Sequence, residues 1–106
     1  MNSEEKQKVL KELGDIPEEL YDELVAEFKT QFNRQMEEIQ KALASNNLTA
    51  VRESAHSLSG TSGNLRIYPV HHAAKALELS LKLAEPLETI KKNFKTLEGI
   101  FLENWK

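Results

Sequence analysis

Apolar residues recur at spacings of three and four along most of the chain, and this spacing limits the chain to helices. One run of this kind consists of Leu20, Leu24, Phe28, Phe32, Met36, Ile39 and Leu43. Such spacing places the apolar side chains on one face of an α-helix. No segment alternates polar and apolar residues with period two, so the sequence predicts no β-strand.

Breaks in this pattern divide the chain into five predicted helices. The first spans residues 3–13, with Ser3 as its cap. The second, a long helix, begins at a predicted capping box of Asp15 and Glu18 and ends before residues 45–47. The other three are predicted over residues 48–65, 69–84 and 87–105.

Four amphipathic helices with short connections favour an all-α fold, an antiparallel up-down four-helix bundle. The segment 3–13 adds a short N-terminal helix to it. A length of 106 residues suits one domain with one hydrophobic core. We therefore expect a single domain over residues 1–106, with the bundle core at about residues 16–105.

Composition and charge exclude several functional classes. The formal net charge of −3 argues against nucleic acid as the main partner. The absence of cysteine excludes disulfides, thiol catalysis and cysteine-ligated zinc. The chain shows no signal peptide and no run of about 20 apolar residues that would span a membrane. We therefore expect a cytoplasmic protein. We also expect a monomer, because the sequence shows no long exposed apolar stripe.

The segment ESAHSLSGTSGNL, residues 53–65, surrounds one histidine with small residues. Each glycine in it disfavours a helix by about 0.8–1 kcal/mol relative to alanine. At about 100° per residue, His56 falls at the flank of the predicted core stripe. The residues on the same side of the helix are Arg52, Ser59, Gly60 and Gly63. The small residues therefore clear the surface beside the imidazole.

A polar stripe on the following helix faces this surface. It consists of His71, Lys75, Glu78 and Lys82, at spacings of four, three and four. An antiparallel pairing of His56 with Glu78 fixes the register of the two helices. The same register places Lys82 opposite Arg52, Lys75 opposite Ser59 and His71 opposite Gly63. We expect one surface with an imidazole, a carboxylate and several cations.

The segment AHSLSGTSGNL, residues 55–65, resembles the motif A-H-x-L-K-G-S-x-x-x-[LI]-G of the histidine-phosphotransfer (HPt) domain family. The resemblance covers roughly residues 20–85 and includes ALE at positions 76–78. It departs from the family at Ser59, where lysine is usual, and at Arg66, where glycine is usual.

The resemblance implies the roles of three residues. His56 would accept the phosphoryl group, Gly60 would let a receiver domain approach closely, and Glu78 would hydrogen-bond the imidazole. The family's reaction runs between the aspartate of a response-regulator receiver domain, or a partner kinase, and another receiver in a phosphorelay. Expected partners are therefore receiver domains, a hybrid sensor histidine kinase, or both. The receiver brings Mg²⁺, so no cofactor or metal is expected on this chain.

The residues themselves fit this chemistry. Phosphoryl transfer needs a positioned nucleophile and charge stabilisation. A neutral nitrogen of His56 is the nucleophile, and Glu78 fixes the ring tautomer. Because Ser59 removes the usual cation, we expect Lys75 to stabilise the phosphate charge. The expected partner-binding residues are Arg52, Ser59, Gly60, Gly63, His71 and Lys82. No glycine-rich phosphate loop or Walker lysine is present, so we expect no ATP-dependent kinase activity.

Two other interpretations remain. A transfer-inactive helical bundle that only binds receiver or kinase domains would keep the fold, and Ser59 is compatible with it. A metal-binding bundle needs core-facing carboxylates and histidines, typically in two Glu-x-x-His motifs. The chain has no such motif, and His71 and His72 point about 100° apart on a helix.

Overall fold

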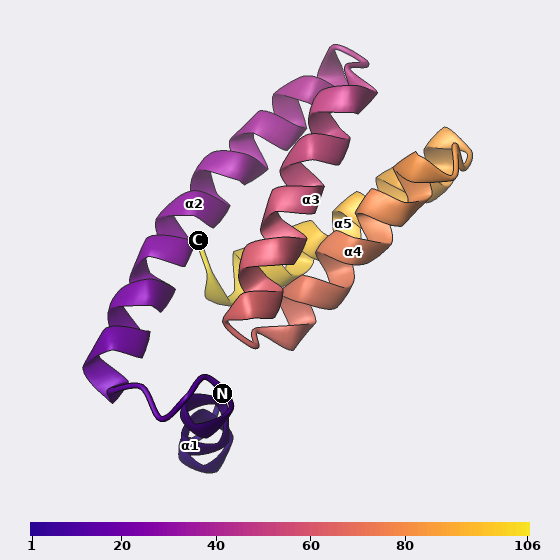
Figure 1. Cartoon of the computed structure of the whole chain (residues 1–106). Coiled ribbons are helices and arrows are strands. Elements are labelled where there is room, and N and C mark those ends of the chain that lie inside the picture. Colours follow the sequence, from indigo (N-terminus) through magenta and orange to yellow (C-terminus); the bar gives the residue numbers. More distant parts are fainter.

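Five helices and no strand form the chain in the computed structural model, which describes residues 1–106 (Figure 1). They are α1 (Ser3–Glu12), α2 (Glu18–Ala44), α3 (Leu48–Asn64), α4 (Tyr68–Lys82) and α5 (Leu87–Asn104). The predicted all-α bundle with a short N-terminal helix is confirmed. None of the five helices combines the length and the apolar character that a membrane crossing requires.

The helices from α2 to α5 pack as neighbours in chain order. α3 packs against both α2 and α4, and α5 packs against α4. In Figure 1, α3 lies between α2 and α4, while α1 lies beside the N-terminal end of α2. Because a short corner joins α3 and α4, the two helices run in opposite directions. Their facing side chains meet along one line of contact, which we call the seam. This seam carries the candidate site.

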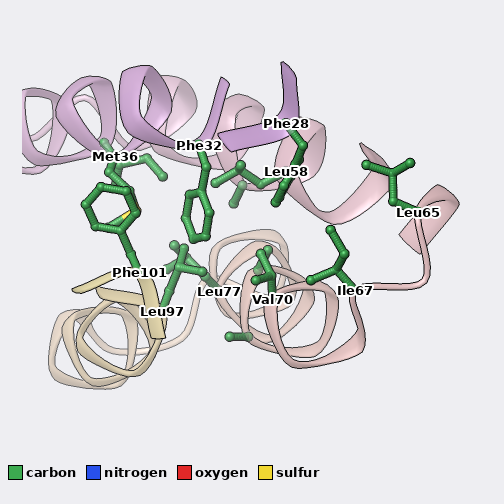
Figure 2. Close-up of a cluster of buried hydrophobic side chains, with 14 of the residues drawn as sticks. Phe28, Phe32, Met36, Leu58, Leu65, Ile67, Val70, Leu77, Leu97 and Phe101 are labelled. Carbon is green, nitrogen blue, oxygen red and sulfur yellow. The ribbon is translucent and has the colours of Figure 1, made fainter. Parts of the chain in front are cut away.

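Apolar side chains from all five helices form the core, and Figure 2 shows part of it, with side chains of α2 to α5. Phe28 and Phe32 of α2 meet the C-terminal end of the chain. The ring centroids are 5.0 Å apart between Phe32 and Phe101, and 5.3 Å apart between Phe28 and Trp105. The side chain of Asn33 also donates a hydrogen bond of 3.0 Å to the carbonyl of Trp105. These contacts close α5 against α2.

Helices α2, α3 and α4 end in the same way. The residue after each C-cap has a positive φ, which is 56° at Asn46, 62° at Arg66 and 53° at Ala84. At the end of α3, the amide of Ile67 donates to the carbonyl of Ser62 at 2.8 Å. This is the Schellman closure, in which glycine is the usual left-handed residue. Arg66 is therefore in a left-handed conformation that suits the glycine of the motif that residues 55–65 resemble.

Two predicted helix caps are wrong. The side chain of Asn2, rather than Ser3, caps α1 by accepting a hydrogen bond of 2.8 Å from the amide of Glu5. Asp15 has a φ of 58° and lies in the turn after α1. Helix α2 instead begins at Glu18 without a side-chain cap. A left-handed backbone does not suit an N-cap, whose φ and ψ are typically extended.

Helix α1 is held to the bundle by a small apolar contact and by charged groups. Val9 and Leu10 are buried. The Nζ atom of Lys6 lies 2.6 Å from Asp22 and 3.0 Å from Glu18, and hydrogen bonds to these carboxylates raise the pKa of Lys6. Beside them, the hydroxyl of Tyr21 donates a hydrogen bond of 2.6 Å to the carbonyl of Leu65. Burial raises the pKa of Tyr21, which keeps this hydroxyl a donor. The contact ties α2 to the corner between α3 and α4.

Candidate functional site

The structure brings His56 of α3 into contact with Glu78 of α4. Nδ1 of His56 lies 2.5 Å from Oε2 of Glu78. The side chain of His56 is 74% exposed, whereas that of Glu78 is 10% exposed. Buried Leu58 and Leu77, which neighbour the two residues in sequence, pack in the core and hold the two helices together (Figure 2). The ring therefore stands on the surface with one nitrogen tied down and Nε2 without a protein partner.

Glu78 is shared between His56 and Lys75. The Nζ atom of Lys75 lies 3.4 Å from Oε1 of Glu78. Burial by itself raises the pKa of Glu78, but the hydrogen bond and charge of His56, followed by those of Lys75, outweigh it, so the pKa is lowered. Glu78 is therefore ionised at neutral pH and acts only as an acceptor. This assigns the proton of the neutral His56 ring to Nδ1, leaving a lone pair on Nε2.

An open depression of about 430 Å³ lies beside His56. Its lining residues are His56, Ser59, Gly60, Gly63, Asn64, Arg66, Tyr68, His71 and Lys75. None of them is a carboxylate, and Arg66 and Lys75 are its permanent cations. The depression therefore offers positive charge next to the free nitrogen of His56.

His71 packs into the same seam one to two turns away from His56. Its Nδ1 donates a hydrogen bond of 2.8 Å to the carbonyl of Ser59 and lies 3.4 Å from the hydroxyl of Ser59. A Cβ atom on Gly63 would lie 2.9 Å from this nitrogen, so only glycine leaves room for the ring. Ser59 is 4% exposed. Ser59 is thus buried against His71, and Gly63 leaves space for the His71 ring.

The other predicted site residues lie around this seam. A Cβ atom on Gly60 would meet no atom within 4 Å, so Gly60 leaves a flat free surface one turn from His56. Arg52 and Lys82 are exposed one turn beyond His56 and Glu78 and do not line the depression. Lys75 lines the depression, but its hydrogen bond goes to Glu78 and not to Ser59, its predicted opposite. No group of three or more histidine, aspartate or glutamate side chains is placed to hold a metal ion.

A second feature, missed at the level of the sequence, is an apolar groove between α2 and α3. It has a volume of about 420 Å³, and its lining includes Leu13, Ile16, Leu20 and Leu24. Leu20 is 42% exposed, although the spacing of apolar residues predicts it in the core stripe. Helix α2 has 27 residues and α3 has 17, so the first turns of α2 extend past the end of α3. Comparing the two predicted helix lengths would have revealed this overhang.

Comparison of the sequence with models of protein families gave a match. The sequence matches the family model of the Hpt domain over residues 23–99. The match spans more than half of the chain, and the chain belongs to the Hpt domain family. It includes all of α3 and α4, while α1 precedes it. Comparisons with curated proteins and with solved structures gave no match.

Proposed function

We propose that this protein is a phosphorelay intermediate in which His56 accepts a phosphoryl group from a receiver aspartate, or from a partner kinase, and passes it to another receiver. Membership of the Hpt family implies histidine phosphotransfer in phosphorelays. The observation that supports His56 as the acceptor is its exposed ring, held at Nδ1 by the buried carboxylate of Glu78. We place the reaction in the cytoplasm.

The transfer itself follows from the geometry of the ring. The lone pair of Nε2 attacks the phosphorus of the receiver's aspartyl phosphate. The N–P bond forms, the P–O bond to the aspartate breaks, and the aspartate leaves as a carboxylate. The ring retains its proton on Nδ1 and becomes positively charged, and the adjacent Glu78 carboxylate stabilises that charge. The reverse sequence delivers the group to the next receiver, and Mg²⁺ belongs to the receiver side of the reaction.

Lys75 is the residue we assign to the charge of the phosphoryl oxygens. Its side chain is 49% exposed, and its contact with Glu78 is long at 3.4 Å. The ammonium group is therefore free to move toward a phosphate on His56. Ser59 carries no charge and is buried, so it does not supply this interaction. Lys75 is also nearer to Glu78 in sequence than the other lysine on this stripe, Lys82.

The remaining residues form the surface that a partner meets. Gly60 permits close approach beside the ring. Arg52 and Lys82 present positive charge from the other side of His56. Ser59, Gly63 and His71 shape the seam by packing against one another. We propose that the partner contacts Gly60, Arg52 and Lys82 directly. Ser59, Gly63 and His71 contribute by giving the depression its shape.

A direct experiment is to incubate the protein with a phosphorylated receiver domain and follow the label. We expect phosphate on this chain that is labile in acid and stable in base. His56→Gln should remove the label. His72→Gln is the matched control, because His72 is exposed and stacks on Tyr68 away from Glu78. A protein that binds receivers but never acquires label would instead be the transfer-inactive binding module that Ser59 is compatible with.

A further inference from the structure

We propose that Arg66 is a docking cation for an acidic patch on the receiver domain, and that Glu12 of α1 masks it. This inference rests on the proposed phosphotransfer function. In the segment that resembles the HPt motif, Arg66 stands at the position of the motif's last glycine, and Ser59 stands at the position of its lysine. Both residues line the depression beside His56. Compared with the motif, the chain therefore lacks the positive charge of the lysine at position 59. It gains the positive charge of Arg66 at the far wall of the depression.

The charge distribution in the depression points to an anionic partner. Arg66 and Lys75 are its two permanent cations, and no carboxylate lines it. The carboxylates paired with these cations, Glu12 and Glu78, are not among the lining residues, so the charged side chains that line the depression are cations, although the whole chain has a net charge of −3. Complementary charges of this kind steer association and fix the register of two surfaces. Acidic side chains on the receiver are the groups that this surface would attract.

The arginine is not required by the turn that it occupies. Asn46 and Ala84 adopt the same left-handed conformation at the ends of α2 and α4 with short side chains. A large side chain at φ 62° is less favourable than glycine. The guanidinium group nevertheless has a defined position, because Nη1 donates a hydrogen bond of 2.9 Å to the carbonyl of Gly63. That bond holds the charge at the wall of the depression.

Helix α1 controls how much of this charge is available. Nε of Arg66 lies 3.3 Å from Oε2 of Glu12, and the side chains are 32% and 38% exposed. Exposed pairs of this kind are weak. Nη2 of Arg66 has no protein partner and stays open to solvent. Acidic groups of a docking receiver would therefore compete with Glu12 for the guanidinium. The Hpt match covers residues 23–99, so Arg66 lies inside it and Glu12 lies outside it.

The test compares apparent KM and kcat for phosphoryl transfer from a receiver domain that labels the wild-type protein. Arg66→Gly suits the left-handed backbone and should keep the fold. It should raise KM by about two- to fivefold, the range expected for one exposed charge, with kcat little changed. Glu12→Gln should lower KM by a similar factor. In the double variant, Glu12→Gln should have no effect, because the charge that it unmasks is gone.

Controls separate a charge effect from a structural one. Arg66→Lys should retain most of the wild-type KM, and added salt should reduce the differences between variants. An unchanged KM for Arg66→Gly would overturn the docking role. An effect of Glu12→Gln that persists in the Arg66→Gly background would overturn the mask.

Binding of unphosphorylated receiver domains of the source organism, measured by calorimetry, separates this inference from the proposed function. If binding weakens with Arg66→Gly but no receiver transfers phosphate, the phosphotransfer function fails and the docking cation stands. If transfer occurs and Arg66→Gly changes neither binding nor KM, the docking cation fails and the function stands. The absence of both binding and transfer with every receiver overturns both.

Discussion

His56 and His71 lie on the same seam between α3 and α4, and each places Nδ1 against an oxygen atom of the other helix. The acceptor for His56 is the carboxylate of Glu78, and the ring is largely exposed. The acceptor for His71 is the backbone carbonyl of Ser59, and the ring is half-buried over Gly63. A carboxylate stabilises positive charge on the ring, whereas a neutral carbonyl mainly fixes its orientation. The carboxylate acceptor makes His56 suited to carry a positively charged phosphorylated ring. The carbonyl acceptor makes His71 suited to a packing role.

The largest expected effect comes from removing the acceptor that distinguishes His56. Glu78→Ala should slow phosphotransfer by roughly 10- to 100-fold, as loss of a ring-orienting carboxylate does at metal-bound histidines. Glu78→Gln should retain much of the rate, because its amide oxygen still accepts from Nδ1. Single-turnover transfer from a phosphorylated receiver measures both rates. Equal rates for Glu78→Ala and the wild type would show that the carboxylate has no part in the reaction.

The comparison of His56 with His71 can also be tested through protein stability, because Gly60 lies near His56 and Gly63 lies under the ring of His71. Gly60→Ala meets open space and should stabilise the helix by up to about 1 kcal/mol. Gly63→Ala has the same intrinsic gain, but its Cβ atom overlaps the ring of His71, and such overpacking costs about 1–3 kcal/mol. Urea unfolding should therefore separate the two variants by about 1–3 kcal/mol. In a His71→Ala background, where the overlap is gone, the separation should disappear. A separation that persists there would place the strain elsewhere.

A smaller effect is expected at Lys75. Lys75→Ala should slow transfer or shorten the lifetime of phosphohistidine by at most about fivefold, the range of one exposed ion pair. Ser59→Lys should restore the charge only when His71→Ala accompanies it, because His71 covers the buried Ser59. Lifetimes of the labelled protein at low and high salt measure this. A loss at Lys82→Ala instead of Lys75→Ala would mean that the cation lies on the opposite side of His56.

The smallest effect concerns pH. His56 and Lys75 hold the pKa of Glu78 below its ordinary value, against the burial that raises it. The stability that comes from the ionised carboxylate is therefore complete above the ordinary glutamate pKa. It is lost as the pH falls through the lower native pKa. Wild type should lose more stability than Glu78→Gln between about pH 5 and pH 3, where glutamate titrates. Thermal melts that run parallel over this range would contradict the coupling.

The helices and the seam were predictable because helical periodicity is a local property. Spacings of three and four assign side chains to faces, and one antiparallel pairing then brings His56 to Glu78 and Gly63 to His71. Ser59 and Lys75, which the same register places opposite each other, both line the depression, but their polar contacts go to His71 and Glu78. The carbonyl of Ser59 points along α3 toward Gly63, and there it meets Nδ1 of His71.

Other features depend on information that periodicity does not contain. Leu20 belongs to the apolar face of α2 but lies beyond the end of its partner helix, so it is 42% exposed. The ion pair between Glu12 and Arg66 joins residues 54 positions apart and depends on the orientation of α1. Asn2 has the extended backbone of an N-cap and Ser3 is already helical, a choice that the spacing of apolar residues does not determine. For Leu20 and for the Glu12–Arg66 pair, the deciding contact lies outside the repeat of one helix.

The contact between Asn33 and Trp105 has a consequence for the order of folding. It joins residues 72 positions apart, whereas His56 and Glu78 are 22 positions apart. Closing the longer loop costs more chain entropy, so contacts of short range form earlier. We expect the hairpin of α3 and α4 to belong to the folding nucleus and the return of α5 to follow it. Core substitutions at Leu58 or Leu77 should then slow folding, while substitutions at Phe101 or Trp105 should mainly speed unfolding. Substitutions in the seam between α3 and α4 are in that case expected to change the folding rate as well as the site.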